Sequence, residues 1–97
     1  MPSLSQIQST LAASLPALKQ KYPIARLALF GSVTRDDFDP VKSDIDILVS
    51  FDGSIGIGFI DLANELEQLL GREVDLVSME ALKPRQWEYL KNKMVYV

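Results

Sequence analysis

Residues 44–51 read Asp-Ile-Asp-Ile-Leu-Val-Ser-Phe, and this stretch decides the fold because it combines a strand pattern with two acids. Alternation with a period of two places the isoleucines and Val49 on one face of the predicted strand. Asp44 and Asp46 share the other face, about 7 Å apart along the backbone. One face of the strand is therefore suited to a hydrophobic core, and the other presents two carboxylates.

Helix and strand patterns alternate on both sides of this strand. Apolar residues recur at steps of three and four from Leu4 to Leu18, which predicts a first helix. Pro16 predicts a kink or a restart within that helix, with Ser14 as the cap of a second short piece. The other predicted elements are strands at 25–30, 44–51 and 73–78, a loop at 33–43, a helix at 59–70 capped by Gly71, a last helix from Pro84 to about Lys93 and an edge strand at 94–97. This order predicts an α/β (α+β) domain in which helices pack on a small mixed β-sheet.

The length and composition of the chain limit what the protein can be. With 97 residues, the chain is expected to form a single domain over residues 1–97. It contains no cysteine and no histidine, which excludes a Ser-His-Asp triad, a cysteine nucleophile and a zinc finger. Any bound metal must therefore take oxygen ligands, as Mg²⁺, Mn²⁺ and Ca²⁺ do.

Charge and hydropathy predict the environment of the protein. The net charge is −3, from 10 basic and 13 acidic residues, which argues against direct binding of a nucleic-acid duplex. No apolar run approaches the roughly 20 residues of a membrane span, and the first residues lack the features of a secretory signal. Together with the absence of cysteine, these features predict no membrane association and a cytoplasmic location.

Two aspartates on one face of an apolar strand are expected to bind divalent metal. Neighbouring carboxylates repel each other, and a divalent cation relieves that repulsion. Two such ions roughly 3.5–4 Å apart can hold the attacking and leaving oxygens of a phosphoryl transfer, which typically uses a third carboxylate. Asp75 is the candidate, since it also interrupts an apolar strand, and it would take the proton from an attacking hydroxyl. The alternative is a pair of exposed acids, solvated or paired with Lys42 or Arg35.

Gly31 and Ser32 end the preceding strand in a turn that suits phosphate binding. Glycine allows the backbone to approach a ligand closely, and the following amides with the Ser32 hydroxyl can donate to phosphate oxygens. Arg35 follows three residues after Ser32, where a planar guanidinium can neutralise phosphate charge. Each feature alone also fits a plain turn or a solvated loop charge.

In combination, these motifs resemble the DNA polymerase β-like nucleotidyltransferase superfamily, and more narrowly the minimal nucleotidyltransferases of bacteria and archaea. The resemblance rests on the Gly31-Ser32 turn, the Asp44 and Asp46 pair and the later Asp75, and it covers nearly the whole chain. It implies a nucleotidyltransferase fold, ATP as the donor and Mg²⁺ as the cofactor.

The resemblance also implies a role for each motif residue. The implied catalytic residues and ligands of two Mg²⁺ ions are Asp44, Asp46 and Asp75. The implied nucleotide-binding residues are Gly31, Ser32 and Arg35. Many small members of the family are similar to antitoxins encoded beside a HEPN-type ribonuclease toxin, which they silence by transferring AMP to a tyrosine hydroxyl. The implied activity is therefore Mg-dependent transfer of AMP from ATP to such a partner protein.

The chain departs from the family pattern at the glycine turn. Family members commonly read Gly-Ser-Arg-x-Arg-Gly, whereas this chain has Val33 in place of the first arginine and Asp36 in place of the last glycine. The interval before Asp44 is also one residue longer than in the antitoxin-like group. These departures leave a second hypothesis open, a catalytically weak or inactive module that neutralises its partner by binding alone.

The predicted last helix combines aromatic and basic residues. Trp87, Leu90 and Met94 share one face, which favours packing against the core. The other interpretation is a contact surface for a partner protein, where tryptophan, tyrosine and arginine are enriched.

Overall fold

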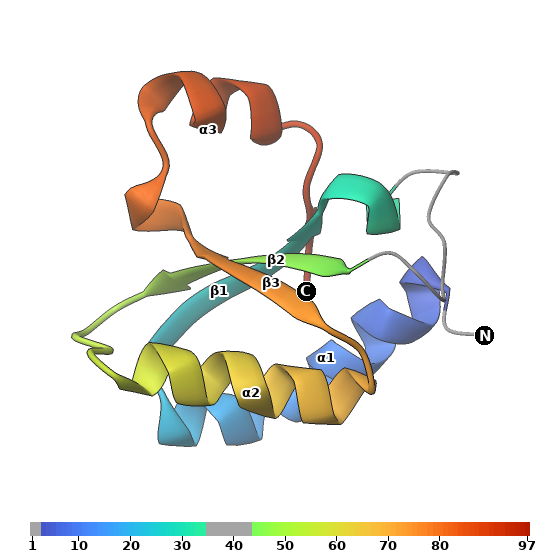
Figure 1. Ribbon diagram of the computed structural model, residues 1–97, viewed down its shortest axis with the longest axis vertical. Helices are drawn as coiled ribbons and strands as arrows, with labels where there is room; N and C mark the ends of the chain where they lie inside the picture. Colours follow the sequence, from blue (N-terminus) through green and yellow to red (C-terminus); the bar gives the residue numbers. More distant parts are fainter. Residues whose placement is uncertain (1–2, 35–43) are drawn as a thin grey trace.

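The computed structural model describes residues 3–34 and 44–97 of the chain (Figure 1). Its elements follow the predicted order along the chain. They are α1 (Leu4–Lys21), β1 (Ile24–Phe30), the 3-10 turn η1 (Gly31–Thr34), β2 (Ile45–Phe51), α2 (Gly58–Leu70), β3 (Val74–Ser78), the 3-10 turn η2 (Met79–Ala81), α3 (Pro84–Leu90) and β4 (Val95–Tyr96). Within the described ranges, no helix is both long enough and apolar enough to cross a membrane.

The strands form one mixed sheet in the order β3-β2-β1-β4. β1 pairs antiparallel with β2 and with β4, whereas β2 pairs in parallel with β3. A parallel pair needs a crossover connection, and α2 supplies it. In Figure 1, α1 and α2 lie on one side of the sheet and α3 lies on the other. The prediction of a small mixed sheet packed with helices is confirmed.

The hydrophobic core lies between the sheet and the helices α1 and α2. Ile45, Ile47 and Val49 of β2 are fully buried in it, as their alternation predicts. The helices contribute Ile7, Leu11, Leu18, Leu62 and Leu66. Full burial of one such side chain stabilises the fold by about 1.5–3 kcal/mol, so this face decides which way β2 is turned. Asp46 therefore belongs to the opposite face of the sheet.

The first helix contradicts the kink or restart that was predicted at Pro16. α1 is a single helix over Leu4–Lys21 that contains Pro16, and its N-cap is Ser3 rather than Ser14. Pro16 is exposed, so water can solvate the carbonyl that lacks a proline N–H partner. Leucines on both sides of Pro16 are buried against the sheet, and we attribute the continuity of α1 to their burial, which offsets a proline penalty of about 3 kcal/mol.

The end of α2 positions the start of β3. Gly71 caps α2 as predicted, in a left-handed conformation with φ of 66°, and its N–H donates to the carbonyl oxygen of Glu67 at 2.8 Å. The Glu67 side chain in turn accepts a hydrogen bond of 3.0 Å from the N–H of Val74. Asp75 follows Val74 directly, so the hydrogen bond between Val74 and Glu67 helps to place it in the sheet.

The last helix is shorter than predicted and does not pack into the core. α3 ends at Leu90, and a turn at 91–93 follows where the helix was expected to continue. The structure describes every residue of α3 and buries none of them; Trp87 and Tyr89 are 36% and 63% exposed. The core-packing interpretation of the aromatic face is therefore wrong. The turn reverses the chain, so that β4 can pair with β1 as the predicted edge strand.

Candidate active site

Two of the predicted carboxylates are neighbours across the parallel strands. The register of β2 with β3 pairs Asp46 directly with Asp75. The N–H of Ile45 donates to the carbonyl oxygen of Glu73 at 3.0 Å and holds this register at the end of the sheet where β2 begins. Paired residues of adjacent strands present their side chains on the same face, so both carboxylates lie on the face away from α1 and α2.

The glycine turn lies directly against Asp46, one member of this pair. Gly31 has φ of 72°, a left-handed conformation, and a Cβ added to it would overlap an oxygen of the Asp46 carboxylate. Only glycine therefore lets the backbone come this close to the acid. The Thr34 hydroxyl donates a 2.7 Å hydrogen bond to the carbonyl oxygen of Gly31, which closes the turn. The structure thus brings Gly31 of the predicted phosphate-binding turn beside Asp46, one of the predicted carboxylates.

Two other predicted phosphate-binding groups fall outside what the structure describes. Arg35 lies beyond the described residues, and so does the side chain of Ser32, although the Ser32 backbone belongs to η1. Gly31 is the predicted nucleotide-binding residue whose surroundings the structure describes. Their roles stay predictions.

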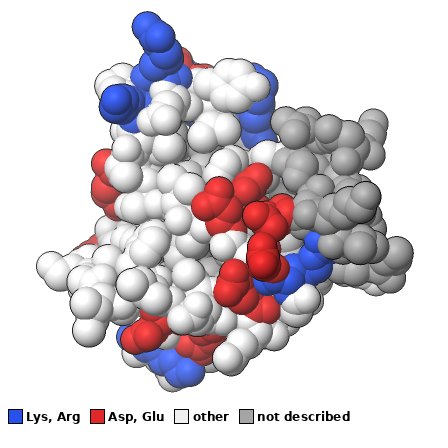
Figure 2. All heavy atoms as spheres, in the orientation of Figure 1, with Lys and Arg blue, Asp and Glu red and all other residues white. Residues whose placement is uncertain are grey.

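Acidic side chains gather on the surface around the pair. Figure 2 shows a patch of aspartate and glutamate over β3 and the adjoining part of the sheet. Asp44, immediately before β2, and Asp75 are exposed, and Asp46 is half-buried. Carboxylate oxygens are the donors that Mg²⁺ prefers, so the chemistry of this set fits the predicted ion. Within residues 3–34 and 44–97, no three Asp, Glu, His or Cys side chains lie close enough together to hold one ion, and the three-carboxylate metal site stays a prediction.

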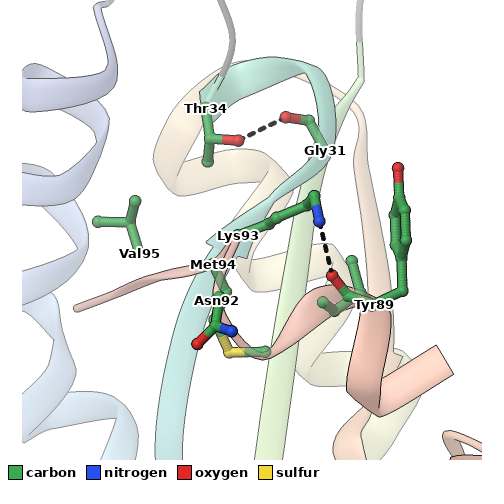
Figure 3. A pocket seen from close by; sticks show the side chains of 8 residues that line it. Gly31, Thr34, Tyr89, Asn92, Lys93, Met94 and Val95 are labelled. Carbon is green, nitrogen blue, oxygen red and sulfur yellow. Dashed lines mark hydrogen bonds between the residues drawn. The ribbon is translucent and has the colours of Figure 1, made fainter. Parts of the chain in front are cut away.

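Two cavities border the site, one on each side of the last turn of α3. The first, of about 460 Å³, lies between η1 and the C-terminal turn, where Gly31 and Thr34 contribute to its wall together with Lys93 (Figure 3). The second, of about 560 Å³, lies between α3 and the sheet and includes Asp75. Tyr89 and Leu90 line both cavities, so the end of α3 separates a space beside the glycine turn from a space beside Asp75.

Sequence reasoning missed the C-terminal turn as a wall of the site. Residues 92–95 line the first cavity, although the sequence predicted only helix and edge strand there. The predicted edge strand at 94–97 was the available signal, because its pairing with β1 would bring the residues just before it beside the end of β1. In the structure, Val95 pairs with Leu29, two residues before Gly31.

The fold and the site together define a nucleotidyltransferase domain. A glycine turn at the end of β1 lies against the Asp46 carboxylate on β2, and Asp46 pairs with Asp75 on β3, an arrangement that suits transfer of a phosphoryl group. Residues 11–97 match the family described as "Nucleotidyltransferase domain". The chain therefore belongs to the nucleotidyltransferase domain family.

Known proteins of this kind are similar to the chain over its whole length. The protein adenylyltransferase MntA of Thermococcus cleftensis is 36% identical over 98 residues, which cover 100% of this chain and 98% of the relative. A solved structure described as a candidate minimal nucleotidyltransferase is 33% identical, with a TM-score of 0.79 over 97% of this chain and 95% of that chain. A chain from the complex of a tri-AMPylated HEPN toxin with an MNT antitoxin, from Shewanella oneidensis, has a TM-score of 0.66 over 93% of this chain and 70% of its own length. At 23% identity, this last similarity shows a shared fold.

These similarities confirm the predicted family and the predicted nucleotidyltransferase fold. The chain is an enzyme of the nucleotidyltransferase class, as the motifs at Gly31, Asp46 and Asp75 predicted. The roles of the individual residues and of Mg²⁺ stay predictions.

Proposed function

We propose that this protein transfers AMP from ATP to a hydroxyl group of a partner protein, and that it acts as the antitoxin of a HEPN-type ribonuclease toxin. The observation that carries the proposal is the pairing of Asp46 with Asp75 directly beside Gly31. The proposal is supported by the 36% identity to a protein named as a protein adenylyltransferase. We assign the activity to a single domain that comprises residues 1–97. We place the reaction in the cytoplasm, because the cytoplasm supplies ATP.

Each of the three predicted carboxylates has a role in the proposed transfer. Asp44, Asp46 and Asp75 would hold Mg²⁺, which when bound neutralises charge on the phosphates. The acceptor oxygen attacks the α-phosphorus of ATP, and its new bond to phosphorus forms as the bond to pyrophosphate breaks. The hydroxyl proton passes to Asp75, and pyrophosphate leaves. Asp75 is exposed, so a hydroxyl carried by another protein can reach it.

We propose tyrosine as the acceptor because of the cavity beside Asp75. Its walls include the apolar side chains of Phe30, Val77 and Leu82. An apolar wall next to a carboxylate suits a phenol, whose ring can pack while its hydroxyl meets the acid. The exposed aromatic residues Trp87 and Tyr89 on α3 would contribute to the contact with the partner.

Label transfer from ATP tests the proposed activity. The protein is incubated with α-³²P-labelled ATP, Mg²⁺ and a HEPN-type protein encoded beside it, and the labelled residue is mapped by mass spectrometry. We expect label on a tyrosine of the partner, and loss of labelling when Asp44→Asn and Asp46→Asn are combined. Asp52→Asn is the matched control, since Asp52 is an exposed acid just beyond the far end of β2 and should leave labelling unchanged.

The same assay separates the proposal from the binding-only hypothesis, which Val33 and Asp36 motivate. If the partner is fully neutralised but carries no label, the transfer hypothesis is wrong and the protein acts by binding alone. Label on an amino acid other than tyrosine would retain the transfer reaction and overturn the acceptor.

A further inference from the structure

The walls of the cavity beside the glycine turn come from two segments that are far apart in the sequence. Gly31 and Thr34 of η1 contribute one part of the wall, and Asn92, Lys93 and Met94 contribute another. Figure 3 shows the Lys93 side chain between the Gly31–Thr34 turn and Tyr89 in that view. The cavity therefore touches both the Gly31 backbone, which lies against Asp46, and the C-terminal turn.

The C-terminal turn is held in this position by the sheet. Val95 pairs with Leu29, and the N–H of Val97 donates to the carbonyl oxygen of Leu27 at 3.0 Å. The N–H of Lys93 donates to the carbonyl oxygen of Leu90 at 2.8 Å, which tightens the turn itself. The backbone of Lys93 is therefore positioned without any contribution from its side chain.

Lys93 is the basic residue among the described residues that line this cavity. Its Nζ donates to the carbonyl oxygen of Tyr89 at 3.3 Å and lies 4.4 Å from the centre of the Tyr89 ring. These partners are neutral, and within the described part of the chain Lys93 forms no ion pair with a carboxylate. Lys91 differs, because its Nζ pairs with Glu88 at 2.8 Å. Among the described residues, no acid forms an ion pair with the positive charge that Lys93 brings to the cavity.

A polyphosphate in this site would need such a charge. The site already holds the carboxylates of Asp46 and Asp75, and position 33 carries valine instead of a basic residue. The carbonyl of Tyr89, close to the C-terminal end of α3, would also repel a phosphate unless a cation covers it. Lys93 already covers that carbonyl and lines the same cavity as Gly31.

We propose that Lys93 is a nucleotide-binding residue that contacts the polyphosphate of a nucleoside triphosphate from the wall opposite the Gly31 turn. The proposal rests on the proposed function and adds a residue to it. Lys93 is exposed and has a flexible stem, and its ammonium has three N–H donors, so Nζ can keep the Tyr89 carbonyl and also donate to a phosphate oxygen. The bond to phosphate joins two charged groups, whereas the bond to the Tyr89 carbonyl has only one, which favours the phosphate contact.

Calorimetric titration of the full-length protein with MgATP and with inorganic tripolyphosphate tests this assignment. Lys93→Met should weaken binding of both probes about tenfold, as expected for one charge-assisted contact in a solvated site. Lys93→Arg should restore most of the affinity, because it keeps the charge. Lys91→Met removes a charge two residues away that is already paired with Glu88, and it should leave both affinities unchanged.

Steady-state transfer of AMP gives a second measurement. Lys93→Met should raise the KM for ATP about tenfold with a smaller change in kcat, since Lys93 is placed away from Asp75. Equal affinities for wild type and Lys93→Met, in a protein that still transfers AMP, would overturn the assignment and leave the proposed function intact. An equal loss of affinity in Lys91→Met would also overturn the assignment, because it would show that the net charge of the protein, and not the position of Lys93, decides the affinity. A wild type that binds neither MgATP nor tripolyphosphate would overturn both the assignment and the proposed function.

Discussion

Replacing Gly31 with alanine tests whether the glycine turn and the carboxylates act as one site. Gly31 has φ of 72°, and an added Cβ would overlap the Asp46 carboxylate. The substitution therefore strains the backbone and also displaces an acid that is paired with Asp75. These two effects have different consequences, because strain lowers stability and displacement changes the geometry of the reaction.

The two effects can be given separate magnitudes. A side chain in the left-handed region costs about 1–2 kcal/mol. For a domain of this size, each kcal/mol lowers Tm by about 4–8 °C. Displacing a reacting group by about 1 Å can cost about 10²-fold in rate. We therefore expect Gly31→Ala to lose about 1–2 kcal/mol of stability and about 10²-fold in the rate of AMP transfer.

Gly71→Ala is the matched control for backbone strain. Gly71 has φ of 66°, and among the described residues nothing lies within 4 Å of an added Cβ. It caps α2 and lines neither cavity beside the site. The control should therefore lose a similar amount of stability and keep the wild-type rate.

Thermal unfolding followed by circular dichroism measures the strain, and single-turnover labelling of the partner protein measures the rate. Both variants are assayed at a temperature at which both are folded. The reasoning would be refuted if Gly31→Ala transferred AMP at the wild-type rate, or if Gly71→Ala lost as much activity as Gly31→Ala.

Two further substitutions separate packing from chemistry. The Tyr22 hydroxyl donates a 2.8 Å hydrogen bond to Glu65, so Tyr22→Phe should lower the free energy of unfolding in urea by about 1 kcal/mol. The hydrogen bond to Glu65, together with burial, raises the pKa of Tyr22 from 10.0 to about 12. Because the pKa is higher in the folded state, the wild type should lose this stability as the pH rises from 10 to 12. A Tyr22→Phe variant that lost the same stability at alkaline pH would contradict this assignment. Asp75→Asn should abolish AMP transfer and raise the free energy of unfolding by about 0.3 kcal/mol, because it removes one of two adjacent like charges. Lower stability of Asp75→Asn in the same urea titration would show that the carboxylate holds the fold together instead.

Much of the local structure follows from the sequence, because it depends on residues close together in the chain. The alternation at 44–51 predicted the burial of the isoleucines and Val49, although Leu48 on the opposite face is buried as well, and Gly71 predicted the end of α2. The choice of Asp75 as the third acid also came from a local pattern, one acid within an apolar strand. Pro16 was misjudged for a related reason, since a proline penalty is local, whereas the burial of leucines on both sides of it depends on the sheet.

The sequence by itself therefore determined the order of helices and strands, the buried face of β2 and the acids that share its other face. Only the tertiary structure decided that Asp46 pairs with Asp75 and that Lys93 reaches the cavity beside Gly31. A period of two is unchanged when a strand slides by two residues, so the pattern specifies the face but not the partner. The partner is set by long-range contacts, such as the hydrogen bond from Ile45 to Glu73 and the pairing of β4 with β1, which join residues that the local pattern does not relate.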